Sequence, residues 1–124
     1  MRELSTSEAM VMKAIWDAGE DISQADLGEA LEREYGKDYK RTTIATFLQR
    51  LVEKGYVTTY RIRKYAYVHA EISEQEYKKS LMRREVDFWF KGSVSDLIAS
   101  LSEAERIEKD DAEKIRRILD GMDD

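Results

Sequence analysis

The feature that most constrains the fold is a helix-opening motif that occurs three times. In each copy an apolar residue precedes a serine, and an acidic residue follows three positions after it. The serine oxygen can accept a hydrogen bond from a free backbone N–H of the first helical turn, and the carboxylate suits the positive end of the helix dipole. The motif therefore predicts three helix starts. The three copies are Leu4-Ser5-Glu8, Ile22-Ser23-Asp26 and Ile72-Ser73-Glu76.

Glycines mark the expected ends of the first three helices. The first helix runs to about Asp17 and stops at Gly19, because glycine tolerates the left-handed conformation that ends many helices. The second ends near Gly36, and a third, over about residues 41–54, closes at Gly55. Helical spacing selects the side chains that we expect in the core. They are Met12, Ile15, Trp16, Leu27, Ala30, Leu31, Ile44, Phe47, Leu48 and Leu51.

After Gly55 the pattern changes from helical to alternating. Residues 56–61 and 65–69 alternate and are rich in Tyr, Val and Thr, which favours two β-strands. The segment between them contains no Asn-Gly or Asp-Gly, so the turn residues stay open. Three helices followed by a hairpin are typical of a winged helix-turn-helix.

Three further amphipathic segments follow, over about residues 73–91, 95–102 and 111–119. No linker rich in Pro, Gly or Ser separates them from the hairpin. We therefore expect a mainly α protein with a small β-hairpin. It would have a winged helix DNA-binding domain over residues 1–72 and a helical dimerisation region over residues 73–124.

Charge is distributed unevenly along the chain. Residues 37–64 contain eight basic and two acidic residues, a net charge of +6, although the whole chain carries −5. Residues 1–36 carry −6 and residues 93–124 carry −5. One cationic patch can attract a phosphate backbone even on an acidic protein. The basic middle segment is therefore the candidate nucleic-acid surface.

The third helix and the hairpin supply the candidate DNA contacts. In a helix-turn-helix the second helix of the motif lies in the major groove, and here that is the helix over residues 41–54. Arg50 suits guanine and Gln49 suits adenine, while the hairpin tip suits phosphates or the minor groove. Taken alone, the polar side of the helix could simply be exposed to solvent, and the basic hairpin tip could simply protect a sheet edge. Taken together, the two form one basic pattern that favours DNA contact. The predicted contacts are Lys40, Arg41, Thr42, Thr43, Thr46, Gln49, Arg50, Arg61, Arg63 and Lys64.

The helix over residues 73–91 carries an apolar stripe that we expect to be buried. Burying each large apolar side chain stabilises the protein by about 1.5–3 kcal/mol. Either the rest of the chain or a second copy can cover the stripe. We favour a homodimer, since a near-palindromic site requires two recognition helices one DNA turn apart. The predicted dimerisation residues are Tyr77, Leu81, Val86, Trp89, Phe90, Leu97, Ile98, Leu101, Ile115, Ile118 and Leu119.

The residue inventory argues against an enzyme. The chain has no cysteine, and its single histidine, His69, lacks the spacing of a metal motif. No glycine-rich phosphate loop is present either. We expect no catalytic residue, no metal and no cofactor. Without a signal peptide or a long apolar run, the chain is expected to be cytoplasmic, with no stable membrane insertion.

Four segments carry a resemblance to a known family over nearly the full length. They are Leu4-Ser5 to Glu8, VMKAIW at residues 11–16, RTTIATFLQRL at residues 41–51 and VEKGYV at residues 52–57. The Thr-Thr-x-x-Thr-x-x-x-Arg-Leu pattern followed by Glu-Lys-Gly is the most specific piece. With these segments the sequence resembles the penicillinase repressor family, the BlaI/MecI/CopY group of bacterial winged-helix repressors.

The resemblance implies a homodimer, held by its C-terminal helices, that represses resistance or stress genes from near-palindromic operators. In one branch of the family it implies a membrane sensor-protease system, with cleavage in the dimerisation region. By alignment the cleaved bond would be Ser100–Leu101. The family's usual Asn-Phe pair and the cysteine pairs of its copper-responsive branch are absent from this chain.

Two other interpretations stay open. One is a winged-helix module that binds a protein through the third helix and the hairpin, without sequence-specific DNA binding. The other is a ligand-sensing repressor with a pocket lined by Trp89 and Phe90.

Overall fold

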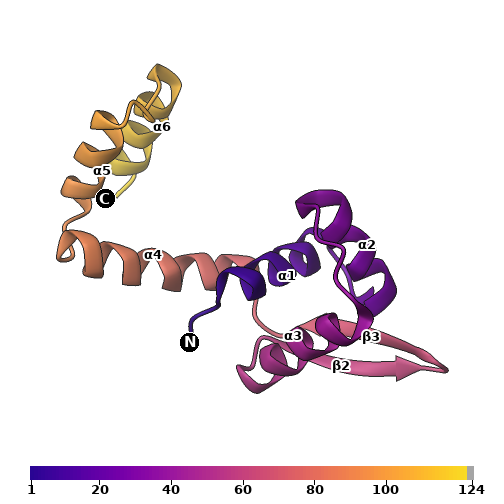
Figure 1. The fold of residues 1–124 in the computed structure, drawn as a ribbon. Helices are drawn as coiled ribbons and strands as arrows, with labels where there is room; N and C mark the ends of the chain where they lie inside the picture. Colours follow the sequence, from indigo (N-terminus) through magenta and orange to yellow (C-terminus); the bar gives the residue numbers. More distant parts are fainter. Residues whose placement is uncertain (123–124) are drawn as a thin grey trace. The chain divides into compact units, whose positions relative to one another are not determined.

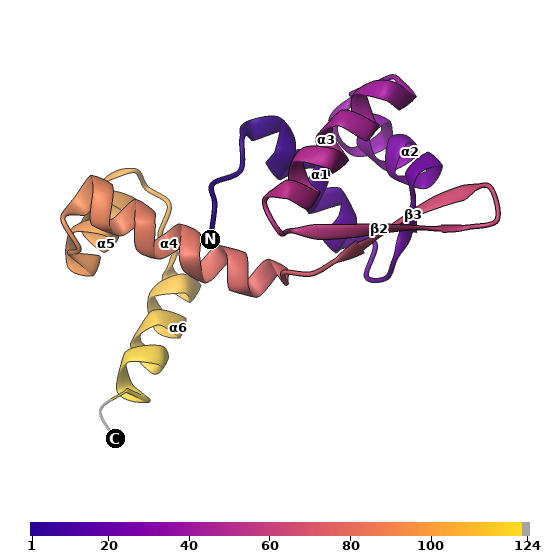
Figure 2. The ribbon, with the colours of Figure 1, turned by 90° about the horizontal axis from the view of Figure 1, so that it is seen from below.

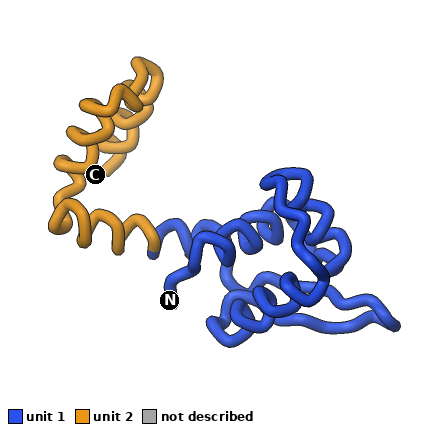
Figure 3. Tube along the Cα trace, viewed as in Figure 1, with its two compact units in different colours: residues 1–80 blue, residues 81–124 orange. Residues whose placement is uncertain are grey.

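The computed structural model describes residues 1–122, which form two compact units. Figure 1 shows the elements, and Figure 3 colours the units, the first spanning Met1–Ser80 and the second beginning at Leu81. The elements are α1 (Thr6–Asp17), β1 (Ile22–Ser23), α2 (Gln24–Tyr35), α3 (Arg41–Glu53), β2 (Val57–Ile62), β3 (Tyr65–Ala70), α4 (Glu74–Phe90), α5 (Val94–Glu103) and α6 (Lys109–Asp120). The fold is the mainly α winged helix-turn-helix that the sequence predicts.

All three predicted serine caps form. The serine Oγ accepts the backbone N–H of the acidic residue three positions later in each case, at 3.2 Å for Ser5 and Glu8, 3.0 Å for Ser23 and Asp26, and 3.1 Å for Ser73 and Glu76. The predicted glycine stops are also confirmed. Gly36, for example, caps α2 in the left-handed conformation with φ 65°, and its N–H donates to the Glu32 carbonyl at 2.9 Å.

The core of the first unit lies among α1, α2 and α3, which contact one another pairwise. Eight of the ten predicted core side chains are buried there. Trp16 and Phe47 are only half-buried, because each packs at the edge of the core. Trp16 donates from Nε1 to the Ile72 carbonyl at 2.8 Å, and Phe47 meets the Tyr39 ring edge-on at 5.2 Å.

The wing is a three-stranded antiparallel sheet in the order β1-β3-β2. Figure 2 shows the hairpin of β2 and β3 extending beyond the helices. Arg63 and Lys64 form its turn, because β2 ends at Ile62 and β3 begins at Tyr65. The sequence predicted the hairpin but missed β1, in which Ile22 pairs with Val68 and Ser23 with Tyr67. A two-residue strand is too short to show alternation, and its partner lies far along the chain.

The first turns of α4 belong to the first unit, although the predicted boundary at residues 72 and 73 assigned them to the second region. Tyr77 is buried, with its ring centroid 5.7 Å from that of Trp16 and 5.9 Å from that of Tyr56. Lys13 of α1 also binds Glu74 of α4. We expected Tyr77 in the dimerisation surface. Its ring is instead covered by aromatic side chains of its own chain.

The second unit has a different character. None of its described residues, 81–122, is buried, although α5 and α6 are amphipathic. Within residues 1–122 no helix has the length and apolar character needed to cross a membrane.

Candidate nucleic-acid interface

The two faces of α3 have different roles. Ile44, Leu48 and Leu51 are buried and fasten the helix to the core. On the other side Thr42, Thr46, Gln49 and Arg50 are exposed, whereas Thr43 is half-buried at the flank. The Thr46 hydroxyl donates to the Thr42 carbonyl at 3.0 Å, so its oxygen remains available only as an acceptor. The remaining amide and guanidinium groups face solvent.

The N-terminal end of α3 is anchored to α2. The Gln24 side-chain amide donates to the Arg41 carbonyl at 3.1 Å. Lys40 is the N-cap residue and makes no side-chain cap. The side chains of Lys40 and Arg41 are both exposed at the first turn of the helix.

The hairpin tip is braced by its own side chains. Arg61 Nη1 donates to the Lys64 carbonyl at 3.2 Å across the turn. Lys64 Nζ lies 5.6 Å from the centroid of the Tyr65 ring, within cation–π range. Arg63 occupies the left-handed region with φ 57°, and its side chain is exposed. The predicted tip cations thus stand on a short, well-defined turn.

Two hollows lie between α3 and the wing. One, of about 420 Å³, is bordered by Gln49 of α3 and by Tyr60 and Arg61 of β2. The other, of about 740 Å³, is bordered by Arg41 and Thr42 of α3 and by Arg61 and Lys64 of the hairpin. Of the ten predicted DNA contacts, five border these hollows and five lie outside them. Those outside are Lys40, Thr43, Thr46, Arg50 and Arg63.

Gln24 borders both hollows, and the sequence analysis missed it. A signal was available: Gln24 directly follows the capping Ser23, at the start of the first helix of the helix-turn-helix. In such motifs that helix crosses the DNA backbone.

A polar cluster links the wing to the segment before β1. Asp21 Oδ1 lies 2.7 Å from Nδ1 of His69, and Asp21 Oδ2 accepts from the Tyr60 hydroxyl at 2.6 Å. These bonds, with Tyr60 first and His69 second, lower the pKa of Asp21. The same carboxylate raises the pKa of His69 and that of Tyr60. Within residues 1–122 no three metal-binding side chains gather into a possible metal site.

In the second unit the predicted dimerisation side chains divide by exposure. Trp89 and Ile118 are 67% and 64% exposed, and Leu101 and Leu119 are also exposed. The half-exposed members are Leu81, Val86, Phe90, Leu97, Ile98 and Ile115. Phe88 was missed by the stripe of helical spacing, yet it is 75% exposed and meets the Trp89 ring edge-on at 4.8 Å.

The bond between Ser100 and Leu101 lies inside α5. The Ser100 carbonyl accepts the Ala104 N–H at 3.0 Å, so this segment is helical rather than extended. Cleavage there stays a prediction.

Comparison with known proteins supplies the family. The penicillinase repressor family model matches residues 4–121. The methicillin resistance regulatory protein MecI of Staphylococcus aureus strain N315 is 26% identical over 117 residues, covering 94% of this chain and 93% of its own length. A 16.5 kDa protein of Latilactobacillus sakei is 37% identical over 57 residues, covering 46% of this chain and 37% of its own.

Solved structures agree with the fold. The DNA-binding domain of the repressor BlaI superposes with a TM-score of 0.51 at 26% identity, covering 62% of this chain and 94% of that domain. RosR of H. salinarum superposes with a TM-score of 0.54 at 19% identity, covering 97% and 94%, which supports the fold alone. Because the family match spans residues 4–121, this chain belongs to the penicillinase repressor family and is a transcriptional repressor rather than an enzyme.

Proposed function

We propose that this repressor binds near-palindromic operator DNA as a homodimer, with α3 of each protomer in the major groove and the hairpin on the adjacent backbone. The observation that carries the proposal is the larger hollow, of about 740 Å³, between α3 and the wing. Arg41 comes from the start of α3 and Arg61 and Lys64 from the hairpin, and all three border this one hollow. Such convergence of cations suits a phosphate strand.

The exposed side of α3 suits base recognition. Gln49 and Arg50 present amide and guanidinium donors that can bind adenine and guanine in two-point contacts. Thr42 and Thr46 can pack their methyl groups on thymine, while Lys40, Thr43 and Arg63 extend the surface toward the backbone. We therefore assign specificity to α3 and general affinity to the cations around the hollows.

Support for the homodimer comes from the second unit. None of its described residues is buried, yet Phe88, Trp89 and Ile118 are large apolar side chains that remain mostly exposed. Exposed apolar groups of this size, gathered in one unit, mark interaction surfaces. A second copy is the partner that also supplies the second recognition helix.

DNA selection from random oligonucleotides, followed by mobility-shift titrations, tests the proposal. We expect one enriched near-palindromic motif, and log affinity should fall linearly with log salt with a slope of about −0.9 per phosphate contact. Sedimentation of the free protein should show a dimer. If no motif is enriched, the proposal is wrong and the protein-interaction interpretation takes its place.

A further inference from the structure

The cluster of Asp21, Tyr60 and His69 lies on the face of the sheet opposite α3. Thr58, Tyr60 and Ile62 alternate with Val57, Thr59 and Arg61 along β2. Val57 and Val68 are buried on the helix side of the sheet. Tyr60 and its cross-strand partner Tyr67 alternate with them, so their rings belong to the other face, although both residues also border the smaller hollow. Asp21 reaches this face from the turn before β1 and binds one residue of each hairpin strand.

The position of this cluster along the hairpin matters. The strand β1 supports β3 only at Val68 and Tyr67. Tyr60 pairs with Tyr67 across the hairpin, and their rings stack with centroids 5.6 Å apart. Beyond that pair the hairpin has two strands, and its tip carries the cations that we predict to contact DNA. Two-stranded ribbons twist readily, so the last fixed position sets the direction of the tip.

We propose that Asp21 is a positioning residue that sets the direction of the wing relative to α3, through its bonds to Tyr60 and His69, and thereby raises the preference for operator over unrelated DNA. This inference rests on the proposed function. Simultaneous contact by α3 and the wing tip requires one relative orientation, whereas general phosphate binding tolerates many.

Because Asp21 is negatively charged, the direction in which its removal changes DNA affinity tests the inference. A carboxylate beside a cationic surface repels DNA, so its removal should strengthen binding if only electrostatics matters. If Asp21 holds the wing in place, the same change should weaken operator binding. Glu20 offers a matched control. It is the adjacent exposed carboxylate and makes no polar side-chain contact with any residue in the described part of the chain.

The experiment compares full-length wild type, Asp21→Ala, Tyr60→Phe, the double variant and Glu20→Ala on two duplexes, the selected operator and a scrambled version. Fluorescence anisotropy gives the affinities, and circular dichroism confirms folding at the assay temperature. We expect Asp21→Ala to weaken operator binding about three- to tenfold, with scrambled DNA bound equally or more tightly. Tyr60→Phe keeps the stacked ring and should act in the same direction. The double variant should be little worse than Asp21→Ala, because both changes remove the same bond.

Hydrogen exchange of the DNA-free protein gives a second readout. Amides of residues 61–66 should exchange faster in Asp21→Ala than in Glu20→Ala. The inference is overturned if Asp21→Ala binds the operator as tightly as Glu20→Ala, or if both show equal exchange at the tip. A wild-type chain that does not distinguish the two duplexes contradicts the proposed function instead.

Discussion

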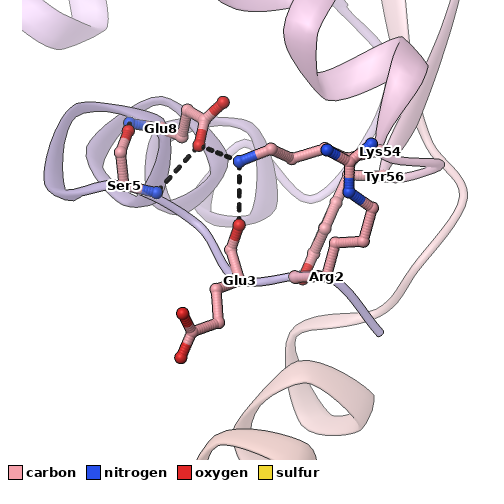
Figure 4. A network of polar contacts seen from close by, with 6 residues as sticks. All are labelled: Arg2, Glu3, Ser5, Glu8, Lys54 and Tyr56. Atoms are coloured by element: carbon pink, nitrogen blue, oxygen red, sulfur yellow. Dashed lines mark hydrogen bonds and ion pairs between the residues drawn. The ribbon is translucent and has the colours of Figure 1, made fainter.

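Lys54 Nζ lies 2.6 Å from Glu8 Oε1 and joins the C-terminal end of α3 to the first turn of α1. The same ammonium group donates to the Glu3 carbonyl at 2.8 Å, and the Ser5 N–H donates to Glu8 Oε1, as Figure 4 shows. Glu8 is only 2% exposed. One cation of the basic segment therefore holds the fold together, while the hairpin cations face solvent.

Replacing Lys54 with methionine should destabilise the protein by about 2–3 kcal/mol, because it leaves the Glu8 carboxylate buried without its cation. Urea denaturation measures this change. Adding Glu8→Gln to the Lys54→Met chain removes the unpaired buried charge, so the double variant should recover part of the lost stability. Lys64→Met, which removes an exposed lysine at the wing, is the control and should leave the midpoint unchanged. Equal midpoints for both lysine variants would contradict the prediction.

The Glu8 carboxylate also predicts acid sensitivity. Burial raises the pKa of Glu8, but the hydrogen bonds from Lys54 and Ser5 lower it more, so the pKa in the folded chain lies below its ordinary value. The stabilisation is present above the unfolded pKa and is lost as pH falls through the folded pKa. Denaturation at several acidic pH values should show wild type and Glu8→Gln converging. A constant difference would count against this pair.

His69 predicts the opposite pH dependence. The pKa of His69 is raised by its hydrogen bond to Asp21 and by the negative charges of Asp21 and Glu71, although desolvation opposes this rise. A raised pKa stabilises the fold below the unfolded value, and this contribution is lost as pH rises through the folded value. The melting temperature of wild type minus that of His69→Gln should therefore decrease from mildly acidic to mildly alkaline pH. A difference that increases over this range would contradict the assignment.

Tyr77 and Trp89, both first assigned to the dimer surface, should now respond differently to truncation. Tyr77→Ala removes a buried ring and should cost about 3 kcal/mol at any protein concentration. Trp89→Ala removes an exposed ring, so it should mainly reduce the rise of the melting temperature with protein concentration. Thermal melts over a concentration series separate the two effects. A concentration-independent melting temperature for wild type would argue against the homodimer.

Arg50 and Lys64 should affect DNA binding in different ways. Arg50→Ala should weaken operator binding by about 1–3 kcal/mol and relax the preference at one base position. Lys64→Ala should weaken all sequences alike and reduce the magnitude of the salt slope by about one contact. Titrations on operator variants at several salt concentrations check both. If Arg50→Ala weakened binding to all operator variants equally, Arg50 would not recognise a base.

Local chemistry explains what could be predicted from the sequence. The serine of each cap and the backbone N–H that it accepts lie three residues apart, so short segments already determine where α1, α2 and α4 begin. The change from helical to alternating pattern after Gly55 likewise located the hairpin. The basic segment could be assigned to one candidate surface because its cations are concentrated in residues 37–64.

Long-range packing decided the rest. The sequence indicated that Glu8 caps a helix, but only the tertiary structure showed that Lys54, far along the chain, turns inward to neutralise it. The pairing of β1 with β3, the burial of Tyr77 and the contact of Asp21 with Tyr60 and His69 have the same origin. A residue's neighbours in sequence set its backbone conformation, whereas its neighbours in space set its burial and its charge partners. The second kind exists only once the chain has folded.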